Sequence, residues 1–444
     1  LAVGLVMGFA LTASAQPNIK ASGQLYMYGT YADNQTGLDE SAKAASSLAG
    51  QSRANIANRL RMQFEIQVQE GLKLTTRFDA LERVWGENHV ANTPSPGATA
   101  WTGANAVTPE RNISWERAYV TFNALYGVFD VGYQASKNWG TCAFCDDFDS
   151  DAGIHYRYMM GPWTFGLEYE KRADTNRSGE GSGQGGAQLG GTDNDHDIYH
   201  IFGIYRWTTG QAGLRWEMDR DANSGKFGAG GAGLTRVAPY GAPLLSGSPL
   251  DTVEWVSTFY ELSPYVQWNI GPFALESELR YIWGETDYNG AQQDIDRKGW
   301  SFYAMGKYTM GAFYGGLEFA WITGDDPGTT DKNEAGVPGG QAWDPMLIYG
   351  NFWNSKHQGV FGTGSPGGAI SAGGGSETNV KFFKPFVGWK VNPQLEVVAQ
   401  FGWLKADEKP LDYVSDDYGK EFDLYANYKI YNNLTYTVGF GYFW

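Results

Sequence analysis

The chain has 444 residues, of which 33 are basic and 49 acidic, so its formal net charge is −16. Phe, Trp and Tyr make up 15% of it and 60 residues are glycine, a composition too aromatic for a disordered chain. Two cysteines are too few for a disulfide scaffold, and the acidic balance is unlike that of a nucleic-acid-binding protein. No run of 18 apolar residues predicts a membrane-spanning helix.

The first 15 residues, LAVGLVMGFALTASA, are apolar and end in Ala13-Ser14-Ala15. An apolar run with such a small-residue end is typical of a secretory signal. The pattern predicts a signal peptide remnant over 1–15 and an exported mature chain from Gln16. The alternative is a buried N-terminal strand or helix. No methionine or basic segment precedes Leu1, so we expect an upstream part that is not in this sequence.

From about residue 18 the apolar residues recur at every second position. Residues 60–69 read LRMQFEIQVQ, a segment with one apolar and one polar face, and Glu70-Gly71 leads into a second such segment at 72–79. This alternation indicates β-strands, and two strands joined by so short a turn form an antiparallel hairpin. The same pattern continues to Trp444.

The connections between these segments alternate in length. Each of eight short turns joins the two strands of a pair. Long connections rich in Gly, Asp, Asn and Ser join one pair to the next. Short periplasmic turns and long extracellular loops are typical of outer-membrane barrels. We therefore predict an all-β protein, a transmembrane antiparallel β-barrel of 16–18 strands, with 16–444 as its single domain. A soluble sandwich with one wet face is the alternative.

The count of strands raises a difficulty. The pattern contains seventeen, whereas single-chain bacterial barrels have an even number. One strand is then either spurious or hidden in a long loop, and the turn assignment places Trp444 at the long-loop end. The apolar faces should meet lipid, and the charged faces predict a lumen that holds water rather than a packed core.

Three stretches resemble a known family: ANRLRMQFEIQVQEGLKLTTRFDALERVW (57–85), ERAYVTFNALYGVFDVGYQ (116–134) and LYANYKIYNNLTYTVGFGYFW (424–444). They resemble trimeric general porins of the bacterial outer membrane, such as those of Desulfovibrio-type sulfate reducers. The resemblance covers most of 16–444. It implies a homotrimer in the outer membrane of a Gram-negative cell, surrounded by lipids and lipopolysaccharide, with passive diffusion through each monomer. Such chains usually end on an aromatic residue at the periplasmic end of the last strand, so Trp444 is expected to end the natural chain there.

A candidate pore constriction follows from charge patterning and from the resemblance. Four arginines lie on the polar faces of three consecutive strands and form a candidate basic patch: Arg59, Arg61, Arg77 and Arg117. The loop 137–152 carries four acids: Asp146, Asp147, Asp149 and Asp151. The corresponding loop of trimeric porins folds into the lumen, so the resemblance implies acids facing arginines. The alternative is that the arginines pair with Glu65, Asp79 and Glu116 while the loop stays outside.

Cys142 and Cys145 lie in the same loop of an exported chain, where a local disulfide is favoured over a redox or metal motif. Alternating acids at 147–151 and 193–197 predict solvated loop charge, with calcium binding or divalent bridging to lipopolysaccharide as the alternatives. The five histidines form no zinc or catalytic signature.

These observations predict a porin for small hydrophilic solutes and ions. They predict no enzyme activity, no metal site, no cofactor and no nucleic-acid partner. The first alternative is a substrate-specific channel for sugars or carboxylates. The next alternative is a barrel enzyme or an adhesin.

Overall fold

The computed structural model describes residues 18–32, 53–85, 113–136, 138–141, 143–145, 150–173, 195–222, 255–288, 293–340, 343–350, 378–409 and 415–444. These residues form one sheet of eighteen strands. The strands are β1 (Asn18–Ala32), β2 (Arg53–Gln69), β3 (Leu72–Val84), β4 (Ile113–Ala124), β5 (Gly127–Ala135), β6 (Ser150–Met160), β7 (Trp163–Ala173), β8 (His196–Trp207), β9 (Gly210–Asp221), β10 (Trp255–Ile270), β11 (Phe273–Tyr288), β12 (Ile295–Met310), β13 (Phe313–Ile322), β14 (Lys332–Asn333), β15 (Val380–Lys390), β16 (Leu395–Lys405), β17 (Asp417–Tyr431) and β18 (Leu434–Phe443). The described part of the chain contains no helix that is long and apolar enough to cross a membrane.

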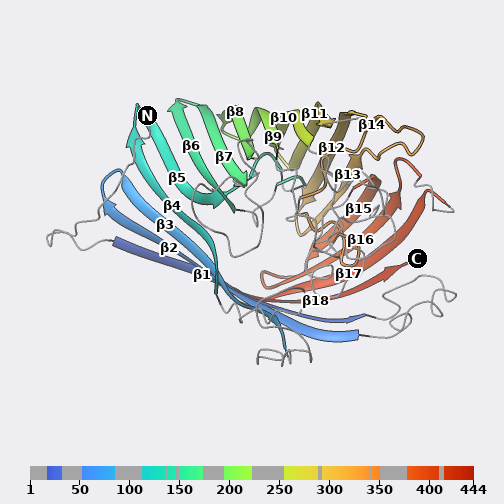
Figure 1. Cartoon of the computed structure of the whole chain (residues 1–444). Helices are drawn as coiled ribbons and strands as arrows, with labels where there is room; N and C mark the ends of the chain where they lie inside the picture. The colour runs from blue at the N-terminus through green and yellow to red at the C-terminus, as the bar shows by residue number, and fades with distance from the viewer. Residues whose placement is uncertain are drawn as a thin grey trace, which may run out of the picture.

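The sheet curls into a barrel-like wall (Figure 1). The seventeen long strands follow chain order around it, and each is antiparallel to the next. The eighteenth, β14, has two residues and lies parallel to the start of β12, where Asp296 pairs with Lys332. The prediction of an all-β antiparallel sheet of 16–18 strands is confirmed.

The first and last strands run in the same direction. Asn18 opens β1 opposite Gln67, beside the short turn after β2, and Leu434 opens β18 directly after another short turn. Trp444 pairs with Lys420 near the start of β17, at the long-connection edge of the wall. The expectation that Trp444 lies at the short-turn edge is therefore wrong. The chain enters β1 at the short-turn edge, and an odd number of alternating strands ends at the other edge.

The backbone conformation of the short turns allows the strands to form tight hairpins. Gly161, Gly271 and Gly311 begin their two-residue turns with φ of 56°, 58° and 59°, a conformation that glycine adopts without steric cost. The turn between β4 and β5 differs, because Leu125 and Tyr126 both have positive φ, 50° and 62°. Tyr126 is 99% exposed, so no packing contact offsets this conformation.

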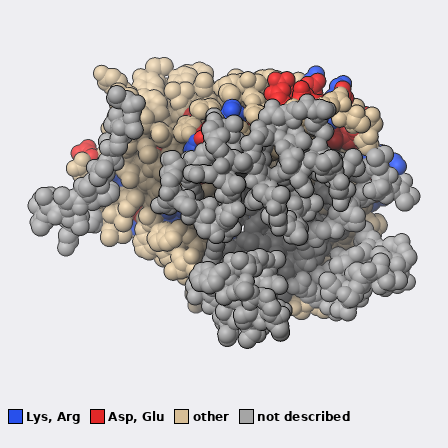
Figure 2. All heavy atoms as spheres, in the orientation of Figure 1, with Lys and Arg blue, Asp and Glu red and all other residues tan. Residues whose placement is uncertain are grey.

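The two faces of the wall differ chemically. Leu167 and Leu214 point outward and are 54% and 51% exposed, whereas Arg215 and Glu217 point inward and are 3% and 8% exposed. The outer surface is largely uncharged in Figure 2, and acidic residues gather at the rim beside β11, β12 and β14. Period-two alternation therefore separates an apolar outer face from a charged inner face, as the pattern predicts.

The main hydrophobic core lies inside the wall. It joins residues of β12, β13, β15, β16 and β17 to residues of three connections: Ala143, Phe144, Tyr303, Ala320, Ile322, Trp343, Met346, Tyr349, Val380, Phe382, Leu404, Ala406 and Tyr418. The expectation that the interior holds water rather than a packed core is wrong for this part of it, because apolar side chains from the connections cover the inner face there.

Candidate functional site

The four predicted arginines lie on neighbouring strands, β2, β3 and β4. Arg77 is directly opposite Arg117 in the register, and Arg61 is opposite Asp79. Arg61 donates through Nε and Nη2 to the two carboxylate oxygens of Asp79, both at 2.7 Å, and Arg59 Nη1 lies 3.8 Å from Asp79. Asp79 is thus held between two of the four arginines. Glu65 lies 3.8 Å from Lys73.

The predicted acids of the loop 137–152 are only partly described. Asp146, Asp147 and Asp149 lie outside the described residues, as does Cys142, so the transverse pairing and the disulfide remain predictions. Asp151, on β6, accepts a hydrogen bond from Arg172 Nε at 3.0 Å. It therefore pairs with the neighbouring strand β7.

The remaining part of this loop packs against the far wall. We call residues 138–141 and 143–145 the inner loop. Trp139 donates its indole N–H to the carbonyl oxygen of Ser263 at 2.9 Å. Thr141 donates its backbone N–H and its hydroxyl to Glu278 Oε2, at 2.5 and 2.8 Å. The chain thus crosses the interior from β5 to β10 and β11.

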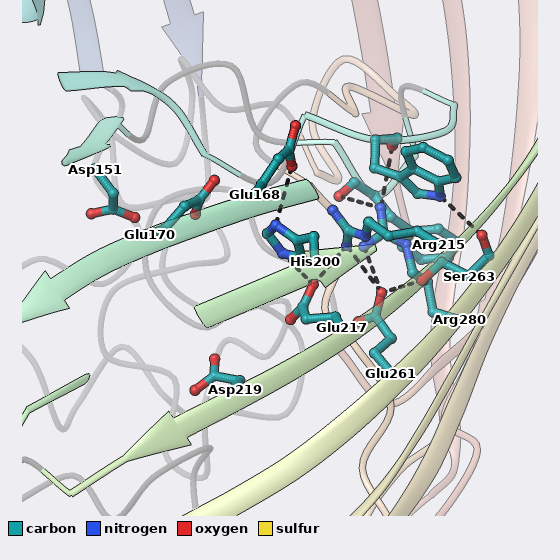
Figure 3. A network of polar contacts seen from close by, with 12 residues as sticks. Asp151, Glu168, Glu170, His200, Arg215, Glu217, Asp219, Glu261, Ser263 and Arg280 are labelled. Carbon is teal, nitrogen blue, oxygen red and sulfur yellow. Dashed lines mark hydrogen bonds and ion pairs between the residues drawn. The ribbon is translucent and has the colours of Figure 1, made fainter. Parts of the chain in front are cut away.

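A network of buried charges receives the inner loop (Figure 3). Arg280 contacts Glu278 at 2.6 Å and Glu261 at 2.9 Å, and Arg215 contacts Glu261 at 3.2 Å and Glu217 at 2.8 Å. All five side chains are at least nine-tenths buried. Charged groups are this buried only when they are paired, which is the case here.

A second segment also packs inside the wall. Residues 343–350 pack on the inner face of β13, β15 and β17, where Glu421 accepts hydrogen bonds from the backbone N–H groups of Ile348 and Tyr349 at 2.7 and 2.8 Å. Lys384 donates to the carbonyl oxygen of Pro345 at 2.9 Å and pairs with Glu318 at 2.7 Å. Glu421 and Lys384 thus hold an irregular segment against the sheet.

Gly340 lies just before the second segment and connects it to the inner loop. Its carbonyl oxygen accepts from the backbone N–H of Trp343 at 2.9 Å, and its own N–H donates to the carbonyl oxygen of Ala143 at 2.7 Å. A side chain at Gly340 would clash with the backbone of Cys145. A cavity of about 400 Å³ is lined by residues of β11, β12, β13, β15, β16 and β17, among them Glu318 and Lys384. Its charged lining residues are Glu276, Glu318, Glu396, Lys307, Lys384 and Lys390. Balanced charge around open space suits polar solutes and ions rather than an apolar ligand.

A row of acids and histidines crosses the inner wall from β5 to β9. The register pairs Asp130 with His155, His155 with Glu168, Glu168 with His200, and His200 with Glu217. His200 lies between Glu168 and Glu217, with its Nδ1 3.1 Å from the first and its Nε2 3.0 Å from the second (Figure 3).

Sequence reasoning missed this row because it searched the histidines for helical or metal-motif spacing. The short turn after Met160 was the available signal. His155 is five residues before Met160 and Glu168 is five residues after Trp163, so the hairpin alone makes them opposite.

Two of the acids predicted as solvated loop charge, Asp195 and Asp197, are paired. Lys171 Nζ lies 2.6 Å from Asp195 and 3.4 Å from Asp197. Both carboxylates thus share one lysine of β7, which corrects the expectation of free solvated charge for these two residues.

No protein-family model matches the chain, and no curated protein matches its sequence. Solved structures are similar in shape: the outer membrane channel DcaP of Acinetobacter baumannii (11% identity, 96% of this chain and 97% of that one, TM-score 0.46), OpdQ of Pseudomonas aeruginosa (12%, 96% and 92%, 0.45) and OmpF of Salmonella typhi in complex with daunomycin (10%, 96% and 97%, 0.43). At such identities and scores these similarities assign neither a family nor a function to this chain.

Proposed function

We propose that this chain forms a water-filled channel through which small hydrophilic solutes and ions diffuse passively across a bacterial outer membrane. The observation that carries the proposal is the opposite chemistry of the two faces of the same strands. The outer face exposes large apolar side chains such as Leu167 and Val438, while the inner face carries paired charges. Lipid outside and water beside the inner charges make that arrangement favourable over the length of a wall.

Conductance measurement tests this directly. The protein, folded in detergent and added to a planar bilayer, should give stepwise conductance increments that scale with salt concentration. Heat-unfolded protein from the same preparation is the control. A folded, membrane-inserted barrel without any conductance would overturn the proposal.

A substrate-specific channel is the second candidate, favoured by the two inner segments and the cavity between charged residues. A general channel should pass solutes according to size alone. A specific channel should show saturable current block by one class, such as sugars or carboxylates. Hydrolysis that one histidine substitution abolishes would instead indicate a barrel enzyme, and cell attachment without conductance would indicate an adhesin.

The proposal includes export through residues 1–15, an outer-membrane location in contact with lipids and lipopolysaccharide, and a homotrimer. The resemblance of 57–85, 116–134 and 424–444 to trimeric porins supports the assembly. Chemical cross-linking and sedimentation of the detergent-folded protein should give three chains per particle. A monodisperse monomer would remove the trimer from the proposal and leave the channel untouched.

A further inference from the structure

Three residues of β6 and β7 form a cluster on the inner wall that the channel does not require. His155, Glu168 and Glu170 each place one ligand atom within 4.8 Å of a ligand atom of the other two. We propose that these three residues bind a divalent transition-metal ion of the zinc class. The proposal stands on side-chain geometry, and it does not depend on conduction.

The cluster contains buried polar atoms without hydrogen bonds. The Glu170 side chain is 2% exposed, and its Oε2 has no hydrogen-bond partner among the described residues. His155 Nε2 lies 3.2 Å from the other carboxylate oxygen of Glu170, but it too has no hydrogen bond there. A buried, unpaired carboxylate oxygen is costly, and a bound cation removes that cost.

The ligand types select the metal. One imidazole nitrogen and two carboxylates make a mixed N and O set, which suits zinc and its neighbours, whereas calcium and magnesium prefer oxygen alone. Three protein ligands leave a fourth tetrahedral position for water. Tetrahedral ligands at zinc bond lengths are about 3.4 Å apart, and His155 Nε2 lies 3.2 Å from Glu170 Oε1. Glu168 Oε1 lies 3.6 Å from the other ring nitrogen, Nδ1, so a metal on Nε2 requires the Glu168 side chain to turn toward it.

The charges also match. Glu168 and Glu170 carry two negative charges, which one divalent cation would balance. Glu168 also lies 3.1 Å from His200 Nδ1, and Glu217, the next acid in the row, is paired with Arg215 at 2.8 Å. Glu170 is therefore the carboxylate of this region whose charge a metal ion would chiefly neutralise.

His200 acts as a positioning residue in this arrangement. Its Nδ1 lies 3.1 Å from Glu168 Oε2, and its Nε2 lies 3.0 Å from Glu217 (Figure 3). His200 is held through Nε2 by Glu217, and its ion pair with Glu168 restrains that carboxylate although Nδ1 makes no hydrogen bond there. Such outer contacts are worth about 10–100-fold in metal affinity.

Binding to the detergent-folded, metal-free protein tests the proposal, with zinc in competition with a chromophoric chelator. Wild-type protein should bind one zinc per chain at this site. Glu170→Gln and His155→Gln should each weaken binding by more than about 100-fold, because each removes a direct ligand, and His200→Gln by about 10–100-fold. His196→Gln is the matched control, because His196 is also an inward histidine beside an acid, with Nε2 2.8 Å from Asp219.

Three results would overturn the site: no zinc binding by folded wild-type protein, unchanged affinity in Glu170→Gln, or loss of binding only in His196→Gln. Heat-modifiable mobility verifies that each variant is folded. X-ray absorption of the zinc-loaded wild-type protein requires no variant. It should show a nitrogen and oxygen shell with one imidazole, and a shell without imidazole would exclude His155.

Discussion

Glu278 on β11 accepts two hydrogen bonds from Thr141, although 137 residues separate them in the chain. The same carboxylate pairs with Arg280, whose Nη2 donates to the carbonyl oxygens of Trp139 and Phe144 at 3.3 and 3.4 Å. One buried acid therefore holds the inner loop against the opposite wall and keeps this loop inside the barrel.

Glu278→Ala should release the inner loop. Breaking a buried ion pair by removing one partner costs about 3–5 kcal/mol, and Thr141 loses both bonds. We expect larger and noisier single-channel conductance. Glu285→Ala is the control, since Glu285 lies on the same strand but is exposed. Equal conductance in wild type and Glu278→Ala would place the inner loop away from the conduction path.

The apolar outer face predicts that a new charge impairs assembly at outward-facing positions and not at inward-facing ones. Leu214→Arg places a charge in the middle of β9 on the lipid side, at a cost of about 2–4 kcal/mol. We expect a smaller fraction of heat-modifiable, protease-resistant barrel in lipid vesicles. Gln211→Arg, on the same strand but facing inward beside Gln267, should assemble normally. Equal assembly of the two variants would mean that the outward and inward faces of β9 are assigned incorrectly.

Replacing Leu125 and Tyr126 with residues that favour positive φ should stabilise the protein. Both residues have positive φ, which costs an L-residue roughly 1–2 kcal/mol. Asn-Gly is the preferred pair for a turn with two positive φ values. Leu125→Asn/Tyr126→Gly should raise the free energy of unfolding in urea titrations. The same double change at Thr208 and Thr209, another two-residue turn, serves for comparison, and a destabilised Leu125/Tyr126 variant would contradict the argument.

The loop after β13 should respond to acid. Burial, opposed by the backbone N–H of Glu334 and reinforced by the carboxylates of Glu334 and Asp326, raises the pKa of Asp325 from 3.8 to about 6. The stabilisation is complete below pH 3.8 and is lost as pH rises through 6, because the folded loop favours the protonated acid.

Hydrogen exchange measures this response. The protection factor of the Gly336 amide, which donates to the Thr323 carbonyl oxygen at 2.9 Å, should be higher at pH 4.5 than at pH 7.5. In Asp325→Asn the protection factor should be the same at both values. Protection that rises with pH in the wild type would reverse the sign and reject the assignment.

The arginine patch should affect ion selectivity. The triple variant Arg59→Ser/Arg61→Ser/Arg77→Ser leaves Asp79 without the two bonds from Arg61. Ions respond to charges within about 8 Å at physiological salt. The reversal potential across a KCl gradient should therefore shift toward cation preference, while Lys405→Ser, in an exposed pair with Asp416, should leave it unchanged. An unchanged value in the triple variant would place the patch outside the ion path.

Alternation at every second residue and the spacing of short turns determined the all-β class, a range of 16–18 strands and the outward face of the strands, because strand periodicity and hairpin register are local properties. The opposition of His155 and Glu168 across the turn after Met160 is local in the same way. The junction of β7 with β8, which brings Glu168 beside His200, spans a long connection, so no local rule sets its register. The same holds for Thr141 on Glu278 and Tyr349 on Glu421. Only the tertiary structure decides those contacts, because buried carboxylates on the inner wall accept whichever backbone N–H groups the folded connections bring to them.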